Sequence, residues 1–310
     1  MSAVPPWALV VTGIVSVQVG SGLAGRMFGE VSPATLTGLR LWTAAAAMAA
    51  FGGRGLARSV RGLIRERAWR DAAVVVAFGV TLAIMNFSFY QAIARIPLGI
   101  AVTIEFLGPL AVAVASSRRL VDLIWVALAG TGVALLSDGW SSLSLHGANP
   151  GGGAGAALAG VAFALVAAAG WAAYILLSAS TGRRFPGSSG LAIAMVVAAV
   201  AVTPAAVAGS AGRGSPLRLA VLGTGIVVGL LSSVIPYRLE METLRRIPAR
   251  IFGIWMSLEP AVAALVGLVL LGEALALREW AAIGCVIMAC AGAARGDAPP
   301  PGDPVPPIPG

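Results

Sequence analysis

Three ionisable side chains lie within segments that are otherwise apolar: Arg40, Glu105 and Glu259. A charged group in hydrocarbon is costly, so one that persists there faces a cavity, a ligand or an opposite charge. A carboxylate can accept hydrogen bonds from an ammonium group or exchange a proton, and a guanidinium can hold a carboxylate. These three residues are therefore candidates for binding a zwitterionic solute or for proton exchange.

The depths of Arg40 and Glu105 along their segments also agree. Arg40 lies about seven residues and Glu105 about eight residues from the same end of their apolar segments, which differ by less than one helical turn. An ion pair between them is geometrically possible, and a purely structural salt bridge is the alternative to a binding role. Glu259 precedes Pro260 and has no evident partner in the sequence; a carboxyl kept neutral by burial is the alternative there.

Amide, phenol and indole groups form a second set of candidates. Asn86, Tyr90 and Gln91 close the third apolar segment, where an i, i+4 spacing puts Asn86 and Tyr90 on one helical face. Gln18 and Trp171 lie in other apolar segments. Buried polar groups need hydrogen-bond partners, which a polar solute can supply. Hydrogen bonding between helices, and ordinary packing for Trp171, are the alternatives.

The elements that position these residues must be membrane helices. Of the 310 residues, 58% are hydrophobic and only 11% are charged, and the mean hydropathy is +0.90. Soluble domains carry about 25% charged residues. Ten segments approach the roughly 20 apolar residues that cross a bilayer. They are 7–25, 34–52, 71–93, 97–117, 121–138, 156–178, 189–209, 218–238, 249–271 and 277–294.

The basic residues indicate the orientation. All 21 are arginines, and with the connection at 53–70 in the cytoplasm 15 of them lie on that side and five on the other. This distribution predicts that both termini are cytoplasmic, and the absence of lysine beside abundant alanine, glycine and arginine suggests a bacterial source. The arginine distribution also accounts for the net charge of +8 without nucleic-acid binding.

A repeat divides the chain. Arg95-Ile96-Pro97 and Pro109 recur at an offset of 151 residues as Arg246-Ile247-Pro248 and Pro260. Five segments per copy is an odd number, so the second copy is inverted in the membrane, as in many alternating-access carriers. An old duplication kept only for packing is the alternative. The predicted units are 1–145, a glycine-rich external tether at 146–155, 156–296, and a disordered proline-rich tail at 297–310.

The sequence offers few residues for enzyme chemistry. The single histidine, His146, lies in the tether, and no phosphate-binding loop occurs, so we expect no enzyme, metal or cofactor. Glu240 and Glu242 are interpreted as part of a solvated charge cluster. Glu273 is expected to cap the helix that follows it.

These motifs together resemble the EamA-type branch of the drug/metabolite transporter superfamily. The resemblance rests on the stretch from Asn86 to Ile93, Arg95-Ile96-Pro97-Leu98-Gly99, Glu105-Phe106-Leu107-Gly108-Pro109, Ser257-Leu258-Glu259-Pro260-Ala261 and Leu271-Gly272-Glu273. Within the superfamily the chain is most similar to the inner-membrane threonine/homoserine exporters. The resemblance implies ten helices in two EamA repeats and proton-driven export of amino acids or related metabolites.

The sequence therefore predicts an all-α polytopic transporter that moves a small polar solute by alternating access. A carrier of another metabolite or drug, a membrane-embedded enzyme acting on lipid and a non-transport membrane subunit are the alternatives. The exact substrate, the coupling ion, the direction of transport and the oligomeric state, a homodimer among the options, are left open by the sequence.

Overall fold

The computed structural model describes residues 4–116, 123–137, 154–211 and 219–296, and within them every regular element is a helix. The first half contains α1 (Pro6–Met27), α2 (Pro33–Arg65), α3 (Trp69–Ile93), α4 (Leu98–Glu105), α5 (Leu107–Ser116) and α6 (Leu123–Ser137). The second contains α8 (Ala154–Gly182), α9 (Ser189–Ser210), α10 (Leu219–Gly229), the π-helix η2 (Leu230–Val234), α11 (Ile235–Leu244), α12 (Ala249–Met256), α13 (Glu259–Val266), the π-helix η3 (Gly267–Leu271) and α14 (Leu277–Gly296). The predicted tail, and the predicted tether except its last two residues, lie outside the described residues.

Eight of the described helical stretches are long and apolar enough to cross a membrane. The remaining two candidates are α2, which carries five arginines, and α6, which is 15 residues long. Large apolar side chains such as Ile84, Leu176 and Val200 are about half exposed or more on the outside of the bundle. Exposed apolar surface on this scale needs an apolar solvent. The chain is thus a multi-pass helical membrane protein.

Two helices are longer than hydropathy predicts. The sequence places the end of the second helix at 52 and a connection at 53–70, but α2 continues to Arg65 and only residues 66–68 lie between α2 and α3. In the same way α11 continues to Leu244, beyond the predicted end at 238. Hydropathy reports contact with lipid, whereas backbone hydrogen bonding can continue in water through good helix formers such as arginine, leucine and alanine.

The repeated prolines interrupt their helices. Proline has no N–H to donate to the carbonyl four residues earlier, which is that of Glu105 for Pro109 and that of Met256 for Pro260. Glu105 and Met256 are the last residues of α4 and α12. Each of the predicted segments 97–117 and 249–271 is therefore interrupted at a break, where one helix ends and the next begins.

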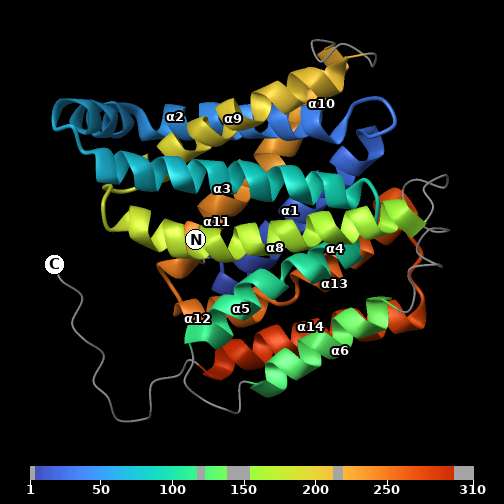
Figure 1. Cartoon of the computed structure of the whole chain (residues 1–310). Helices are drawn as coiled ribbons and strands as arrows, with labels where there is room; N and C mark the ends of the chain where they lie inside the picture. Colours follow the sequence, from blue (N-terminus) through green and yellow to red (C-terminus); the bar gives the residue numbers. More distant parts are fainter. Residues whose placement is uncertain (1–3, 117–122, 138–153, 212–218, 297–310) are drawn as a thin grey trace, which may run out of the picture.

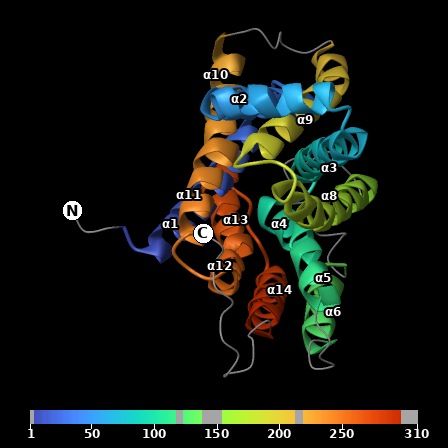
Figure 2. The same ribbon diagram turned by 90° about the vertical axis from the view of Figure 1, so that its left-hand side faces the viewer.

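Helices from the two halves of the sequence pack against each other (Figure 1). The long helices α2 and α9 lie side by side at one edge of the bundle, and α6 and α14 lie side by side at the other. Between them α3 packs on α8, α1 on α11, and α4 on α13. Figure 2 shows the same layers from one end. Each half thus supplies one partner to every one of these pairs.

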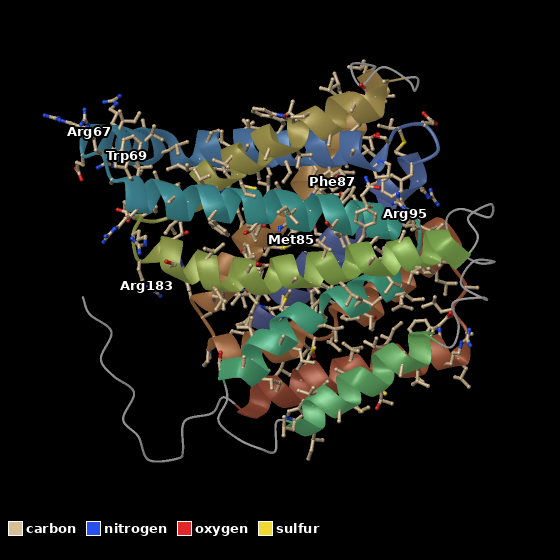
Figure 3. All side chains as sticks on the ribbon, in the orientation of Figure 1. Arg67, Trp69, Met85, Phe87, Arg95 and Arg183 are labelled. Atoms are coloured by element: carbon tan, nitrogen blue, oxygen red, sulfur yellow. The ribbon has the colours of Figure 1, made fainter. Side chains whose placement is uncertain are left out.

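The two ends of the bundle differ in charge. Arg65 ends α2, Arg67 and Arg70 flank the start of α3, and Arg183 and Arg184 follow α8, whose end is joined to α3 by the Arg184–Asp71 ion pair. These five arginines therefore gather at one end, which we call the arginine-rich end. Figure 3 shows Arg67 and Arg183 there and Arg95 at the other end.

The end opposite the arginine-rich end is tightly packed. A Cβ atom built on Gly99 of α4 would lie 2.7 Å from the Cα of Ala264 on α13, so these two helices cross at near backbone contact. Ile96 and Leu98 are fully buried beside this crossing. Small residues permit such close approach of membrane helices. The two halves are therefore closed against each other at this end.

Glu273 adds a polar link at the closed end. The expectation that it caps the following helix is wrong: Glu273 Oε2 accepts a hydrogen bond from the backbone N–H of Leu98 at 2.8 Å, and Glu279 caps α14 instead through Ala276. Gly272, with a left-handed φ of 71°, turns the chain so that the carboxyl reaches α4. Burial raises the pKa of Glu273 to about 7, although the Leu98 hydrogen bond opposes the shift. Glu273 thus joins the second half to the first N-terminal turn of α4.

Candidate functional site

A cavity of about 830 Å³ lies between the two halves and is lined by residues of α1 to α5, α8, η2, α11 to α13 and α14. Its inner part is bounded by Arg40 and Glu105, and it extends to Ser116 and Leu244, the last residues of α5 and α11. Ser116 and Leu244 are exposed, as expected at the mouth of a cavity. The cavity therefore opens toward the arginine-rich end, and the closed end lies beyond its inner part.

Six of the eight residues predicted as binding or proton-exchange candidates line this cavity. They come from six different helices and reach the wall because the bundle turns their faces inward: Gln18, Arg40, Asn86, Glu105, Trp171 and Glu259. Tyr90 and Gln91 are absent from the described cavity wall.

Arg40 is held by the second half of the chain. Its Nε donates to Ser233 Oγ at 3.2 Å, its Nη2 donates to the Ser232 carbonyl at 3.0 Å, and its guanidinium carbon lies 5.4 Å from the centre of the Tyr90 ring. The ion pair with Glu105 that the matching depths allowed is not among the ion pairs of the described residues. Arg40 therefore connects α2 to η2 while facing the cavity.

Pro236 explains why η2 offers carbonyls to other helices. Without an N–H, Pro236 cannot donate to the Ser232 carbonyl in an α-helical bond or to the Leu231 carbonyl in a π-helical bond. The freed carbonyls are taken by Arg40 and by Ser16 Oγ of α1, which donates to Leu231 at 2.7 Å. The irregular helix thus anchors two neighbouring helices beside the cavity.

Glu259 has a partner that the sequence did not reveal. Gln18 Nε2 on α1 donates to Glu259 Oε1 on α13 at 2.8 Å. The two residues are 241 positions apart, and the hydrogen bond exists because α1 packs on α13. The amide oxygen of Gln18, Oε1, and the second carboxyl oxygen of Glu259, Oε2, are buried without a partner in the described structure.

The remaining candidates occupy different surroundings. Asn86 Nδ2 donates to the Leu82 carbonyl of its own helix at 2.8 Å while the residue faces the cavity. Trp171 packs edge-on against Phe106, with ring centres 4.8 Å apart.

The two candidates outside the wall are held by neighbouring side chains. Gln91 Oε1 accepts a hydrogen bond from Arg95 Nη1 at 2.7 Å. Tyr90 is fully buried between Phe28 and Phe89, and its hydroxyl has no partner in the part of the chain that the structure describes.

Glu240 is a cavity residue that sequence analysis assigned to a solvated cluster. It lines the cavity together with Pro236 and Tyr237 on α11, whereas Glu242 pairs with Arg246 at the surface. A signal was present in the sequence, because Pro236 and Glu240 are four residues apart and share a helical face. The extension of α11 beyond 238 brings Glu240 into the bundle.

The cavity is suited to holding a small polar molecule by reversible contacts. Among the described residues its wall carries one guanidinium, that of Arg40, and three carboxyl groups, those of Glu105, Glu240 and Glu259, in otherwise mostly apolar surroundings. The described residues contain no group of three histidine, cysteine or acidic side chains placed to hold a metal ion.

Known proteins share both the sequence and the fold. The model of the EamA-like transporter family matches residues 158–295. The threonine/homoserine exporter RhtA of Escherichia coli strain K12 is 36% identical over 294 residues, which are 93% of this chain and 90% of the relative. RhtA of Salmonella typhimurium strain LT2 matches to the same extent. A solved crystal structure with 18% identity shares the fold, with a TM-score of 0.57 over 93% of this chain and 97% of that chain.

The match to these relatives covers 93% of the chain and therefore extends over both halves. Those relatives are transporters and not enzymes. This chain is a membrane transporter, and it belongs to the EamA-like transporter family.

Proposed function

We propose that this transporter exports small amino acids of the threonine and homoserine type from the cytoplasm by proton-coupled alternating access. The observation that carries the proposal is the cavity itself, whose described wall carries one guanidinium and three carboxyl groups inside an apolar bundle. Groups of both signs suit a zwitterion, and the relatives named as threonine/homoserine exporters support this substrate class.

The cavity has one open and one closed end, as alternating access requires of a single state. It opens at the arginine-rich end, which the positive-inside rule places in the cytoplasm. The Gly99–Ala264 crossing and the Glu273–Leu98 hydrogen bond close the opposite end. Export would require these contacts to separate while the arginine-rich end closes.

The transmembrane topology is part of the proposal. We infer ten membrane-crossing helices in two inverted five-helix repeats, with α2 and α6 crossing in addition to the eight apolar stretches. The exchange of partners between halves supports it, because α1 on α11 corresponds to α8 on α3. Reporter fusions at the two ends of the chain should both report the cytoplasm. Signals from opposite sides of the membrane would contradict the even number of crossings.

Glu105 and Glu259 are the residues we assign to proton exchange. Each is buried in the membrane region and faces the cavity, where water or substrate can deliver a proton. A carboxyl in low dielectric needs a partner or a proton. Protonation of these carboxyl groups and binding of a cationic substrate group to them can therefore exclude each other.

An export assay tests the proposed function. Cells that express the chain and are preloaded with labelled homoserine or threonine should release the label several times faster than cells without it, and should grow at higher external homoserine. An uncoupler that collapses the proton gradient should remove the difference. Equal release with and without the chain, across both amino acids, would contradict amino-acid export and favour another metabolite or a drug as the substrate.

A further inference from the structure

The hydrogen-bonded pair of Gln18 and Glu259 at the cavity wall has hydrogen-bond acceptors that are left unpaired. The two side chains are 1% and 6% exposed, and both line the cavity. Their mutual hydrogen bond uses Gln18 Nε2 and Glu259 Oε1. Gln18 Oε1 and Glu259 Oε2 have no partner among the described residues. Two acceptor oxygens, fixed relative to each other, are thus buried and unpaired on side chains that line the cavity.

The orientation of the Gln18 amide follows from chemistry. An amide turned the other way would put its oxygen against the Glu259 carboxylate, acceptor against acceptor. The observed orientation leaves an oxygen free on each residue, so the pair calls for a donor with at least two hydrogens.

The protein does not supply that donor from the described residues. Arg40 has the one guanidinium on the described cavity wall, and its Nε and Nη2 donate to Ser233 and Ser232. The wall also carries the carboxyl groups of Glu105 and Glu240, so it has an excess of negative charge when these groups are ionised. An anionic or purely accepting group would be repelled from the free oxygens, whereas a primary ammonium offers three N–H donors and a positive charge.

We propose that Gln18 and Glu259 form the receptor for the ammonium group of the transported amino acid. Gln18 Oε1 and Glu259 Oε2 each accept one N–H, and the Gln18–Glu259 hydrogen bond sets the spacing between them. Gln18 is thereby a specificity-determining residue, because it both contacts the ligand and positions the carboxylate. This assignment rests on the proposed function and specifies which atoms of that cavity recognise which end of the substrate.

Binding of matched ligands to the purified transporter tests the assignment. The probes are homoserine and its deaminated analogue 2,4-dihydroxybutyrate, which keeps the carboxylate and side chain but carries a hydroxyl in place of the ammonium. The wild-type protein should bind homoserine at least about tenfold more tightly, since a site built for N–H donors rejects a ligand that lacks them. Gln18→Met should reduce this ratio to about twofold or less, with binding of the hydroxy acid little changed.

Ser21→Ala is the matched control. Ser21 lies on the same helix and also has a buried oxygen without a partner in the described structure, but it is not among the described cavity-lining residues. Its homoserine preference should equal that of the wild type.

Two results would overturn the assignment while leaving export intact. The first is equal binding of homoserine and 2,4-dihydroxybutyrate by the wild-type protein, a measurement that needs no variant. The second is an unchanged preference for homoserine in Gln18→Met. Failure of the wild-type protein to bind any amino acid would overturn the proposed function together with this assignment.

Discussion

Replacement of Arg40 with lysine is expected to reduce export by at least about tenfold per transporter molecule in the membrane. The guanidinium is planar and directs Nε to Ser233 Oγ and Nη2 to the Ser232 carbonyl at the same time. A lysine ammonium is a single point and does not reproduce this fork.

The Ser232 carbonyl has no alternative donor four residues later, because Pro236 stands there. Leaving such a buried carbonyl unpaired costs about 1–3 kcal/mol. We expect the cost to appear both as a lower thermal midpoint and as slower export, since Arg40 also faces the cavity.

Arg238→Lys provides the matched control for Arg40→Lys. The Arg238 guanidinium lies 4.7 Å from the centre of the Phe51 ring on the exposed surface of the protein. Exposed contacts of this kind contribute about 0.5–1 kcal/mol, so export should stay near the wild-type rate. Wild-type export by Arg40→Lys at equal protein level would show that the fork does not matter for transport.

Replacement of Gly108 with alanine is expected to lower the stability of the protein strongly. A Cβ atom at this position would overlap the Ala168 carbonyl oxygen and lie 3.0 Å from its carbonyl carbon. Both are backbone atoms of α8 and cannot rotate away. Overpacking typically costs about 1–3 kcal/mol of stability. Because the contact here is with rigid backbone, we expect a cost at or above the upper end of this range.

Export by Gly108→Ala should fall as well, because Phe106, directly before α5, and Trp171 of α8 line the cavity. Thermal unfolding in detergent and export per molecule are the measurements. Gly284→Ala on α14 is the control, since a Cβ atom there would meet nothing within 4 Å. Equal midpoints for the two variants would contradict the close packing of α5 on α8.

The repeated prolines show how far sequence analysis reaches. Pro109 and Pro260 mark interruptions because a missing N–H is a property of one residue and its near neighbours. The structure has a break just before each of these prolines, where one helix ends and a second one begins. Local backbone chemistry is thus readable without knowing any partner.

The contacts of Arg40, Glu259 and Glu273 show what the sequence does not predict. Arg40 pairs with serines of η2 rather than being paired with Glu105, Glu259 binds Gln18, and Glu273 reaches Leu98. Each partner lies more than 170 positions away in the chain. Depth in the membrane can be counted along one helix, but the direction in which a side chain points between helices cannot.

The amino-acid sequence by itself determined that the chain is a helical membrane protein with a motif that recurs in its second half and with ionisable groups in apolar segments. Solvation by lipid requires a long apolar stretch for each membrane crossing, and such a stretch can be recognised in the linear sequence. Only the tertiary structure decided which ionisable groups share a cavity, that Glu240 joins them and at which end that cavity opens. These properties depend on which helix faces meet, and packing between segments that are distant in the sequence determines which faces meet.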